Sequence, residues 1–133
     1  MAALVRHDTS TELADGRRRG DDPITQLYDA LDRVDALRNP RTARLLTAGR
    51  AKMAQKLLEE AGEVALEAVL CRPRAVVRES ADLIYHLTVL WRDCGISPEA
   101  VWAEMRDRAD ALGIAEKLPK SPACPATSAG GGR

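Results

Sequence analysis

Five carboxylates near the middle of the chain form two short clusters whose spacing suits the binding of a divalent metal ion. The first cluster is Glu59, Glu60 and Glu63, and the second is Glu79 and Asp82. Residues three or four positions apart lie on one face of an α-helix, so each cluster would line one helix edge. Carboxylate oxygens are the ligands that Mg²⁺ prefers. If two helices bring these edges together, a divalent cation between them would offset the repulsion among the acids.

The first cluster lies in residues 52–70, a segment with the periodicity of an amphipathic helix. At about 100° per residue, Glu67 falls in the same sector as the three glutamates. Lys52 and Lys56 fall there too, so positive charge lies close to the acids. The opposite side of this helix is apolar and consists of Leu57, Leu58, Ala61, Val64, Ala65, Ala68 and Val69.

The second cluster lies in residues 73–95, a segment that begins with proline and ends with glycine, as helices often do. His86 shares an edge with Glu79 and Asp82. The apolar stripe of this helix is Val76, Leu83, Ile84, Leu87 and Leu90. Acids in this arrangement are also typical of a solvated helix face neutralised by neighbouring bases, and helical spacing alone leaves that interpretation open.

Composition favours a helical fold and excludes several classes of partner. The chain has 133 residues with 20 basic and 20 acidic side chains, so no net field attracts nucleic acid or an anionic membrane. Aromatic residues make up only 3%, and small aliphatic residues dominate, which favours helix packed on helix. Cys71, Cys94 and Cys124 form no CxxC pair, so we expect reduced thiols and a cytoplasmic protein. We also expect neither a secretory signal nor a membrane span.

Capping residues and breaks divide the chain into four to five helices between two tails. Asp22-Pro23 and Ser97-Pro98 are helix starts, because a side-chain oxygen caps the first turn and proline fits within it. The flanking residues 1–21 and 115–133 lack periodicity and are expected to be disordered, which leaves one all-α domain at 22–114. The expected helices run from 22 to about 38, from 42 past a weak point at Gly49 to about 70, from 73 to about 95, and from 97 to 113.

Three stretches resemble the phosphoribosyl-ATP pyrophosphohydrolase family, which belongs to the all-α MazG-type nucleoside triphosphate pyrophosphohydrolases. They read NPRTARLLTAGRAKMAQKLLEEAGEVALEAV, ESADLIYHLTVLW and GISPEAVWAEM. The core of the resemblance is EExxE on one helix, here residues 59–63, followed by ExxD on the next, here 79–82. Either cluster alone is a weak signal, but the two in this order, with TARLL before and ADLIYHL after, are far more specific. The resemblance implies a helical bundle of the MazG-like type.

The resemblance also implies a reaction and a set of site residues. The reaction is Mg²⁺-dependent hydrolysis of phosphoribosyl-ATP to phosphoribosyl-AMP and pyrophosphate, the second step of histidine biosynthesis. Glu60, Glu63, Glu79 and Asp82 would be the metal ligands. Glu59 would be a further ligand or the base that orients the attacking water, with Glu60 as its catalytic neighbour. The metal ion would join the carboxylates to an anionic polyphosphate that they would otherwise repel, and would lower the pKa of a bound water.

Basic residues extend the candidate site toward the phosphates. Lys52 and Lys56 lie one and two turns before the acids, and with Arg44 they are candidate phosphate contacts. Lys56 is equally suited to an i,i+4 pair with Glu60. His86 is a candidate donor that orders a metal-binding carboxylate, or a histidine satisfied at a helix interface.

The chain departs from the resembled pattern where the nucleotide would lie. Pro40 and Arg41 stand where a serine and a tyrosine usually precede the threonine, here Thr42, which is expected to cap its helix or to bind the ligand. Leu58 stands where a glycine usually precedes the paired glutamates. One alternative is therefore a housecleaning pyrophosphohydrolase that acts on another (d)NTP. An alternative of another class is a non-catalytic helical interaction module.

The two acid-bearing helices carry more apolar surface than a small helical chain covers. We therefore expect a homodimer or a higher homo-oligomer with helices packed across a two-fold axis. The expected partners are thus a nucleotide substrate and a second copy of the chain.

Overall fold

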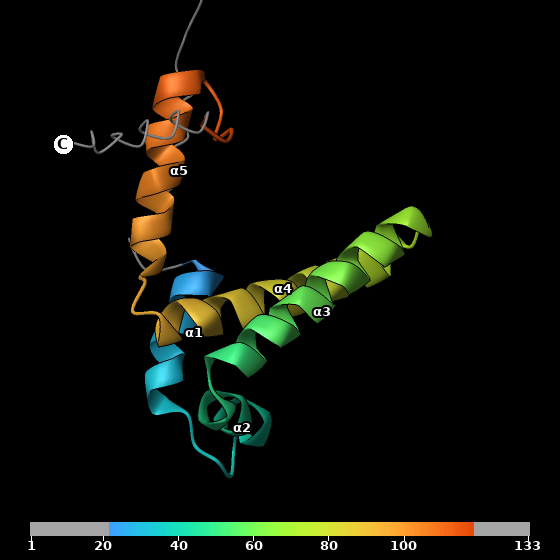
Figure 1. Ribbon diagram of the computed structural model, residues 1–133, viewed down its shortest axis with the longest axis vertical. Helices are drawn as coiled ribbons and strands as arrows, with labels where there is room; N and C mark the ends of the chain where they lie inside the picture. The colour runs from blue at the N-terminus through green and yellow to red at the C-terminus, as the bar shows by residue number, and fades with distance from the viewer. Residues whose placement is uncertain (1–21, 119–133) are drawn as a thin grey trace, which may run out of the picture. The chain divides into compact units, whose positions relative to one another are not determined.

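The computed structural model describes residues 22–118 as five α-helices and one short 3₁₀ segment (Figure 1). Those residues contain no strand, so the prediction of an all-α fold is confirmed. Of the segments expected to be disordered, 1–21 and 115–133, residues 1–21 and 119–133 lie outside the described residues, and 115–118 form neither helix nor strand. The elements are α1 (Pro23–Ala30), η1 (Leu31–Arg33), α2 (Pro40–Ala48), α3 (Arg50–Val69), α4 (Pro73–Asp93) and α5 (Pro98–Leu112).

The described residues divide after Gly95 into two compact units. The first contains α1 to α4, and the second contains α5. The predicted start and end of α5 are confirmed: the Ser97 hydroxyl accepts the Ala100 N–H at 3.2 Å, and Gly113 closes the helix at φ +79°. The single domain expected over 22–114 stays a prediction.

The core of the first unit takes one buried side chain from each of its four chain segments. Leu31 of η1, Leu45 of α2, Met53 of α3 and Val89 of α4 form this cluster. Met53 and Val89 are only 1% and 0% exposed. Because the core is this small, α2 is held against the α3–α4 pair by few apolar contacts, and polar contacts matter more for its position.

Helices α3 and α4 form an antiparallel hairpin, packed along their length (Figure 1). At the open end of the hairpin, Arg50 Nε donates to Asp93 Oδ2 at 2.6 Å, and the same guanidinium donates to the Asp93 carbonyl at 3.1 Å. Arg50 lies at the positive N-terminal end of α3 and Asp93 at the negative C-terminal end of α4, so each charge is unfavourable with its own helix dipole. Their pairing neutralises both charges and joins the two helix ends.

The predicted end of the first helix near Arg38 is wrong. Helix α1 ends at Ala30, tightens into η1, and the chain becomes extended at Val34, with ψ 126°. Val34 packs against the core, whereas Leu37 is 92% exposed. The segment has helical periodicity, but the packing of Val34 against the core overrides this local preference and the helix ends early.

The expected role of Thr42 as a helix cap is also wrong. Helix α2 begins at Pro40 and Asn39 occupies the N-cap position, so Thr42 already lies inside the first turn. Its hydroxyl is hydrogen-bonded to the Tyr85 hydroxyl of α4 at 2.6 Å. Gly49 does more than weaken the helix: its φ of +90° and ψ of 173° separate α2 from α3. That backbone conformation is essentially restricted to glycine.

Candidate functional site

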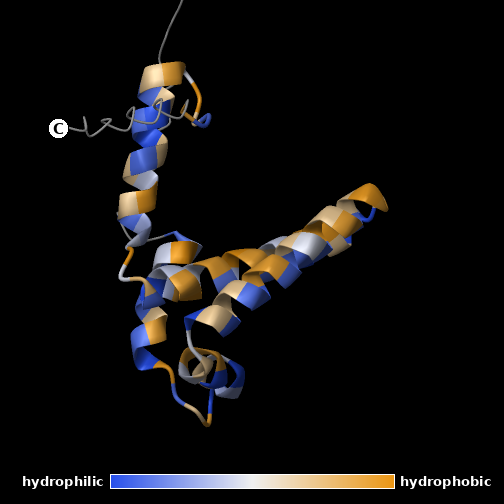
Figure 2. Ribbon diagram, in the orientation of Figure 1, coloured by the Kyte–Doolittle hydropathy of each residue, from blue (hydrophilic) through white to orange (hydrophobic). Residues whose placement is uncertain are grey.

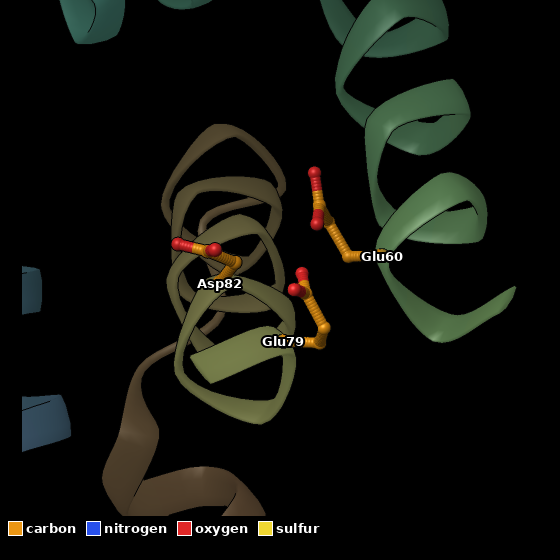
Figure 3. A group of neighbouring side chains, drawn as sticks. All are labelled: Glu60, Glu79 and Asp82. Atoms are coloured by element: carbon orange, nitrogen blue, oxygen red, sulfur yellow. The ribbon is translucent and has the colours of Figure 1, made fainter. Parts of the chain in front are cut away.

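Glu60, Glu79 and Asp82, here called the three-carboxylate site, converge between α3 and α4. One oxygen of each lies within 4.8 Å of an oxygen of the other two. Figure 3 shows Glu60 reaching from α3 toward the two acids of α4. Oxygen ligands of an octahedral Mg²⁺ lie about 2.1 Å from the ion, hence roughly 3 to 4 Å from one another. Small side-chain rotations would bring these oxygens to that spacing, so the donor set fits an oxygen-preferring divalent cation.

Glu63 adds a fourth carboxyl group beside this site. Its proximity to Glu79 is the main reason that the pKa of the Glu79 carboxyl group is raised. The charges of Glu63, Asp82 and Glu60 raise it further. The structure therefore brings three of the four acids predicted as metal ligands within 4.8 Å of one another, with Glu63 beside Glu79, in a place where positive charge is needed.

Glu59 and Glu67 lie on α3 outside the three-carboxylate site. Glu59 accepts hydrogen bonds from Lys56 Nζ at 2.6 Å and Gln55 Nε2 at 2.9 Å, and these bonds lower the pKa of its carboxyl group. Its predicted role as the base that orients water stays a prediction. Glu67, which shares the helix sector of the first cluster, has a side chain only 20% exposed, and its carboxylate lies 3.5 Å from Arg72.

Two groups contact Glu60 from either side. Lys56 Nζ and His86 Nε2 each lie 3.6 Å from Glu60 Oε1, and Glu60 is only 9% exposed. Burial lowers the pKa of His86, although Glu60 partly opposes this, so its imidazole is neutral near pH 7. His86 Nδ1 is buried without a hydrogen-bond acceptor or donor among residues 22–118. The histidine expected to order a site carboxylate thus lies against Glu60, one helix away.

An open pocket of about 810 Å³ adjoins the three-carboxylate site within the first unit. Two site carboxylates lie at its wall, together with four basic side chains from α2 and α3. Such a mixture of charges suits an anionic ligand that is bound together with a cation. The lining residues are Arg41, Thr42, Arg44, Leu45, Ala48, Lys52, Lys56, Glu60, Asp82, Tyr85 and His86.

All three residues predicted to contact phosphate line this pocket. Arg44 Nε donates to the Pro40 carbonyl at 3.3 Å, and Lys52 Nζ donates to Gln55 at 3.2 Å. Lys56 forms the i,i+4 pair with Glu60 that the sequence analysis left as an alternative. Arg41 also lines the pocket, and the sequence analysis missed it as a site residue. The available signal was its position in α2, four residues before Leu45 and seven before Ala48, on the same helix face.

Comparisons with known proteins identify a family for the chain. Residues 24–109 match the family model for phosphoribosyl-ATP pyrophosphohydrolase. The chain is 56% identical over 102 residues to phosphoribosyl-ATP pyrophosphatase 2 of Rhodopseudomonas palustris, covering 75% of this chain and 78% of that protein. It is 64% identical over 81 residues to phosphoribosyl-ATP pyrophosphatase 2 of Bradyrhizobium diazoefficiens, covering 61% and 60%. With the phosphoribosyl-ATP pyrophosphatase of Rhodospirillum rubrum the identity is 46% over 104 residues, covering 74% and 89%.

None of the helices in residues 22–118 has the length and apolar character needed to cross a membrane.

Proposed function

The chain belongs to the phosphoribosyl-ATP pyrophosphohydrolase family, and we propose that it hydrolyses phosphoribosyl-ATP to phosphoribosyl-AMP and pyrophosphate with Mg²⁺. The observation that carries this proposal is the convergence of three carboxylates, two of which lie at the wall of a pocket that also holds four basic side chains. A polyphosphate needs both features, because bare carboxylates repel it and basic residues attract it. The chain is accordingly an enzyme and not a non-catalytic helical module.

Glu60, Glu79 and Asp82 would hold the metal ion, with Glu63 as the neighbouring fourth ligand. When bound, Mg²⁺ would join the carboxylates to phosphate oxygens and lower the pKa of a bound water. Lys56 and His86 support the arrangement by keeping the Glu60 carboxylate in place from two sides. Arg44, Lys52 and Lys56 would neutralise the phosphates as they enter the pocket.

Glu59 is the candidate general base in this proposal. In the free protein its hydrogen bond from Lys56 lowers the pKa of the carboxyl group. If Lys56 turns toward a phosphate, Glu59 loses that bond and its pKa rises toward the ordinary value of 4.5. Glu59 would then accept a proton more readily when substrate is present than when the pocket is empty.

Pyrophosphate release tests the proposal directly. The purified protein should release pyrophosphate from phosphoribosyl-ATP, far faster than from ATP or dATP, and only when Mg²⁺ is present. Asp82→Asn should abolish release, while Asp107→Asn, an exposed change on α5, should leave it unchanged. Faster release from a dNTP than from phosphoribosyl-ATP would replace the proposal with a housecleaning function.

The apolar outer side of the α3–α4 hairpin supports assembly with a second copy. Leu58 and Val69 of α3 are 74% and 81% exposed, and Val77 of α4 is 70% exposed. Figure 2 shows apolar residues along both helices of the hairpin. Faces of this length are normally covered in a stable protein, and a second copy would cover them symmetrically. We infer a homodimer formed through these helices.

The mass of the protein in solution, measured by light scattering after size exclusion, tests this inference. Leu58→Glu should convert the dimer to a monomer because it places a charge on the covered face. Leu37→Glu is the matched control, since Leu37 is 92% exposed but lies outside the hairpin. A wild-type protein that is monomeric at micromolar concentration would exclude the dimer.

A further inference from the structure

We propose that Arg41 binds the second phosphate of the substrate, the one carried by the added phosphoribosyl group. It would thereby select phosphoribosyl-ATP over nucleoside triphosphates that lack this phosphate. The proposal rests on the proposed function and names the residue that sets its specificity. Arg41 stands at a position where this chain departs from the resembled pattern.

The register of α2 places Arg41 at the pocket. Arg41, Leu45 and Ala48 are spaced i, i+4 and i+7, so they share one helix face, and all three line the pocket. Leu45 on this face is 8% exposed and belongs to the core, which fixes the rotation of the helix. The neighbouring residue Thr42 is bonded to Tyr85 at 2.6 Å, which fixes the first turn of α2 against α4. The backbone of Arg41 is therefore held, and its side chain projects from a positioned helix turn.

Among the basic residues that line the pocket, Arg41 differs in its lack of a bonding partner within residues 22–118. Lys56 is bonded to Glu59 and lies near Glu60, Lys52 donates to Gln55, and Arg44 Nε donates to a backbone carbonyl. Within the described chain, 22–118, Arg41 has no hydrogen bond or ion pair, although two carboxylates line the same pocket. A guanidinium that its own protein leaves unpaired beside acids is available to an anionic ligand.

Charge is distributed unequally along the pocket. On α3 the lining residues run from Lys52 through Lys56 to Glu60, so the wall changes from positive to negative over about 12 Å of helix, at 1.5 Å per residue. The triphosphate would lie at the end with the carboxylates, because the metal ion would bind it there. Arg41 belongs to α2, the helix that contributes only basic and uncharged residues to the lining.

The substrate has two anionic parts, which match the carboxylate end of the pocket and its basic α2 wall. Phosphoribosyl-ATP carries anionic groups at two places, the triphosphate and the phosphate of the second ribose, whereas ATP carries only the triphosphate. A terminal phosphate monoester has a charge of about −1.5 to −2 at pH 7 and three acceptor oxygens. The planar guanidinium of arginine can bind two of those oxygens at once, which a lysine cannot do.

Kinetics with paired substrates test the proposal. Arg41→Gln should raise KM for phosphoribosyl-ATP about tenfold with kcat nearly unchanged, because the lost contact lies away from the reacting phosphates. The slow hydrolysis of ATP should not change. Arg41→Lys should recover part of the loss. Arg74→Gln, a charge change at an exposed α4 residue outside the pocket lining, is the matched control.

A binding cycle gives a second readout that does not depend on turnover. Calorimetry should show that the wild type binds phosphoribosyl-AMP about tenfold more tightly than AMP, and that Arg41→Gln binds both equally. Equal losses for both ligands, or no loss for either, would overturn the proposal. These results are distinct from failure of the proposed function, in which the wild type itself would not hydrolyse phosphoribosyl-ATP.

Discussion

Glu60→Gln provides the sharpest test of the three-carboxylate site, because it removes one charge and almost no volume. In the free protein the change has two opposing effects. It relieves repulsion from Asp82, whose nearest oxygen lies within 4.8 Å, worth about 0.9 kcal/mol in a water-like dielectric. It also loses the pair with Lys56 at 3.6 Å, which is worth roughly 0.2 to 1 kcal/mol for a partly exposed pair. The stability of the metal-free protein should therefore change little.

Metal affinity should respond much more strongly. A carboxylate about 2.1 Å from Mg²⁺ contributes about 4 kcal/mol of attraction in a water-like dielectric. Subtracting the relieved repulsion leaves about 3 kcal/mol, equivalent to roughly a hundredfold loss of affinity. At Mg²⁺ one hundred times the wild-type Kd, metal binding stabilises the wild type by about 2.7 kcal/mol and the variant by only about 0.4 kcal/mol.

Thermal unfolding followed by circular dichroism, with and without Mg²⁺, measures the difference. For a domain of this size the metal should raise Tm of the wild type by more than about 10 °C and that of Glu60→Gln by about 2 to 3 °C. Glu67→Gln, two turns later on the same helix and outside the three-carboxylate site, should keep the full increase. An undiminished increase in Glu60→Gln would refute the reasoning, because the metal would then bind elsewhere.

Three further predictions follow from individual contacts. The raised pKa of Glu79 means that a proton competes with the metal, so Kd for Mg²⁺ should rise up to tenfold per pH unit as pH falls through that pKa. Without metal, the contribution of Glu79 to the stability of the fold should decline as pH rises through the same pKa. Calorimetry at several pH values, with Glu79→Gln as the reference, checks both signs. Tyr85→Phe should cost about 1 kcal/mol in urea unfolding, because it removes the 2.6 Å bond to Thr42, while Tyr28→Phe should be neutral. Lys56→Met should raise KM roughly tenfold in steady-state assays, as expected for one lost charge-assisted phosphate contact, and a change confined to kcat would contradict a binding role.

Local chemistry in the sequence was sufficient to predict several helix ends. Pro73, Ser97 and Gly113 mark helix ends that the structure confirms, because capping depends on neighbouring residues only. The convergence of Glu60 with Glu79 was also predictable, since periodicity defines one edge on each of two consecutive helices. These features involve short sequence separations.

The features that the sequence did not predict depend on contacts between distant segments. Val34 leaves the helical path because the core holds it, and the core is assembled from four elements. Thr42 bonds Tyr85, a residue 43 positions away, and no local rule indicates that partner. Arg41 was missed as a site residue for the same reason: its position on the pocket wall depends on how α2 lies against α4.

The change of direction at Gly49, between α2 and α3, places the arginines of α2 at the pocket. No atom lies within 4 Å of the position that a Cβ would occupy there, so a side chain would meet no obstacle and only the backbone angles favour glycine. Any other residue would prefer to continue the helix, and residues 40–69 would then extend as one straight rod. Arg41 and Arg44 would be carried away from α4, and only Lys52 and Lys56 of α3 would remain beside the carboxylates. If Arg41 binds the second phosphate as proposed, substrate selection depends on the one amino acid that has no side chain.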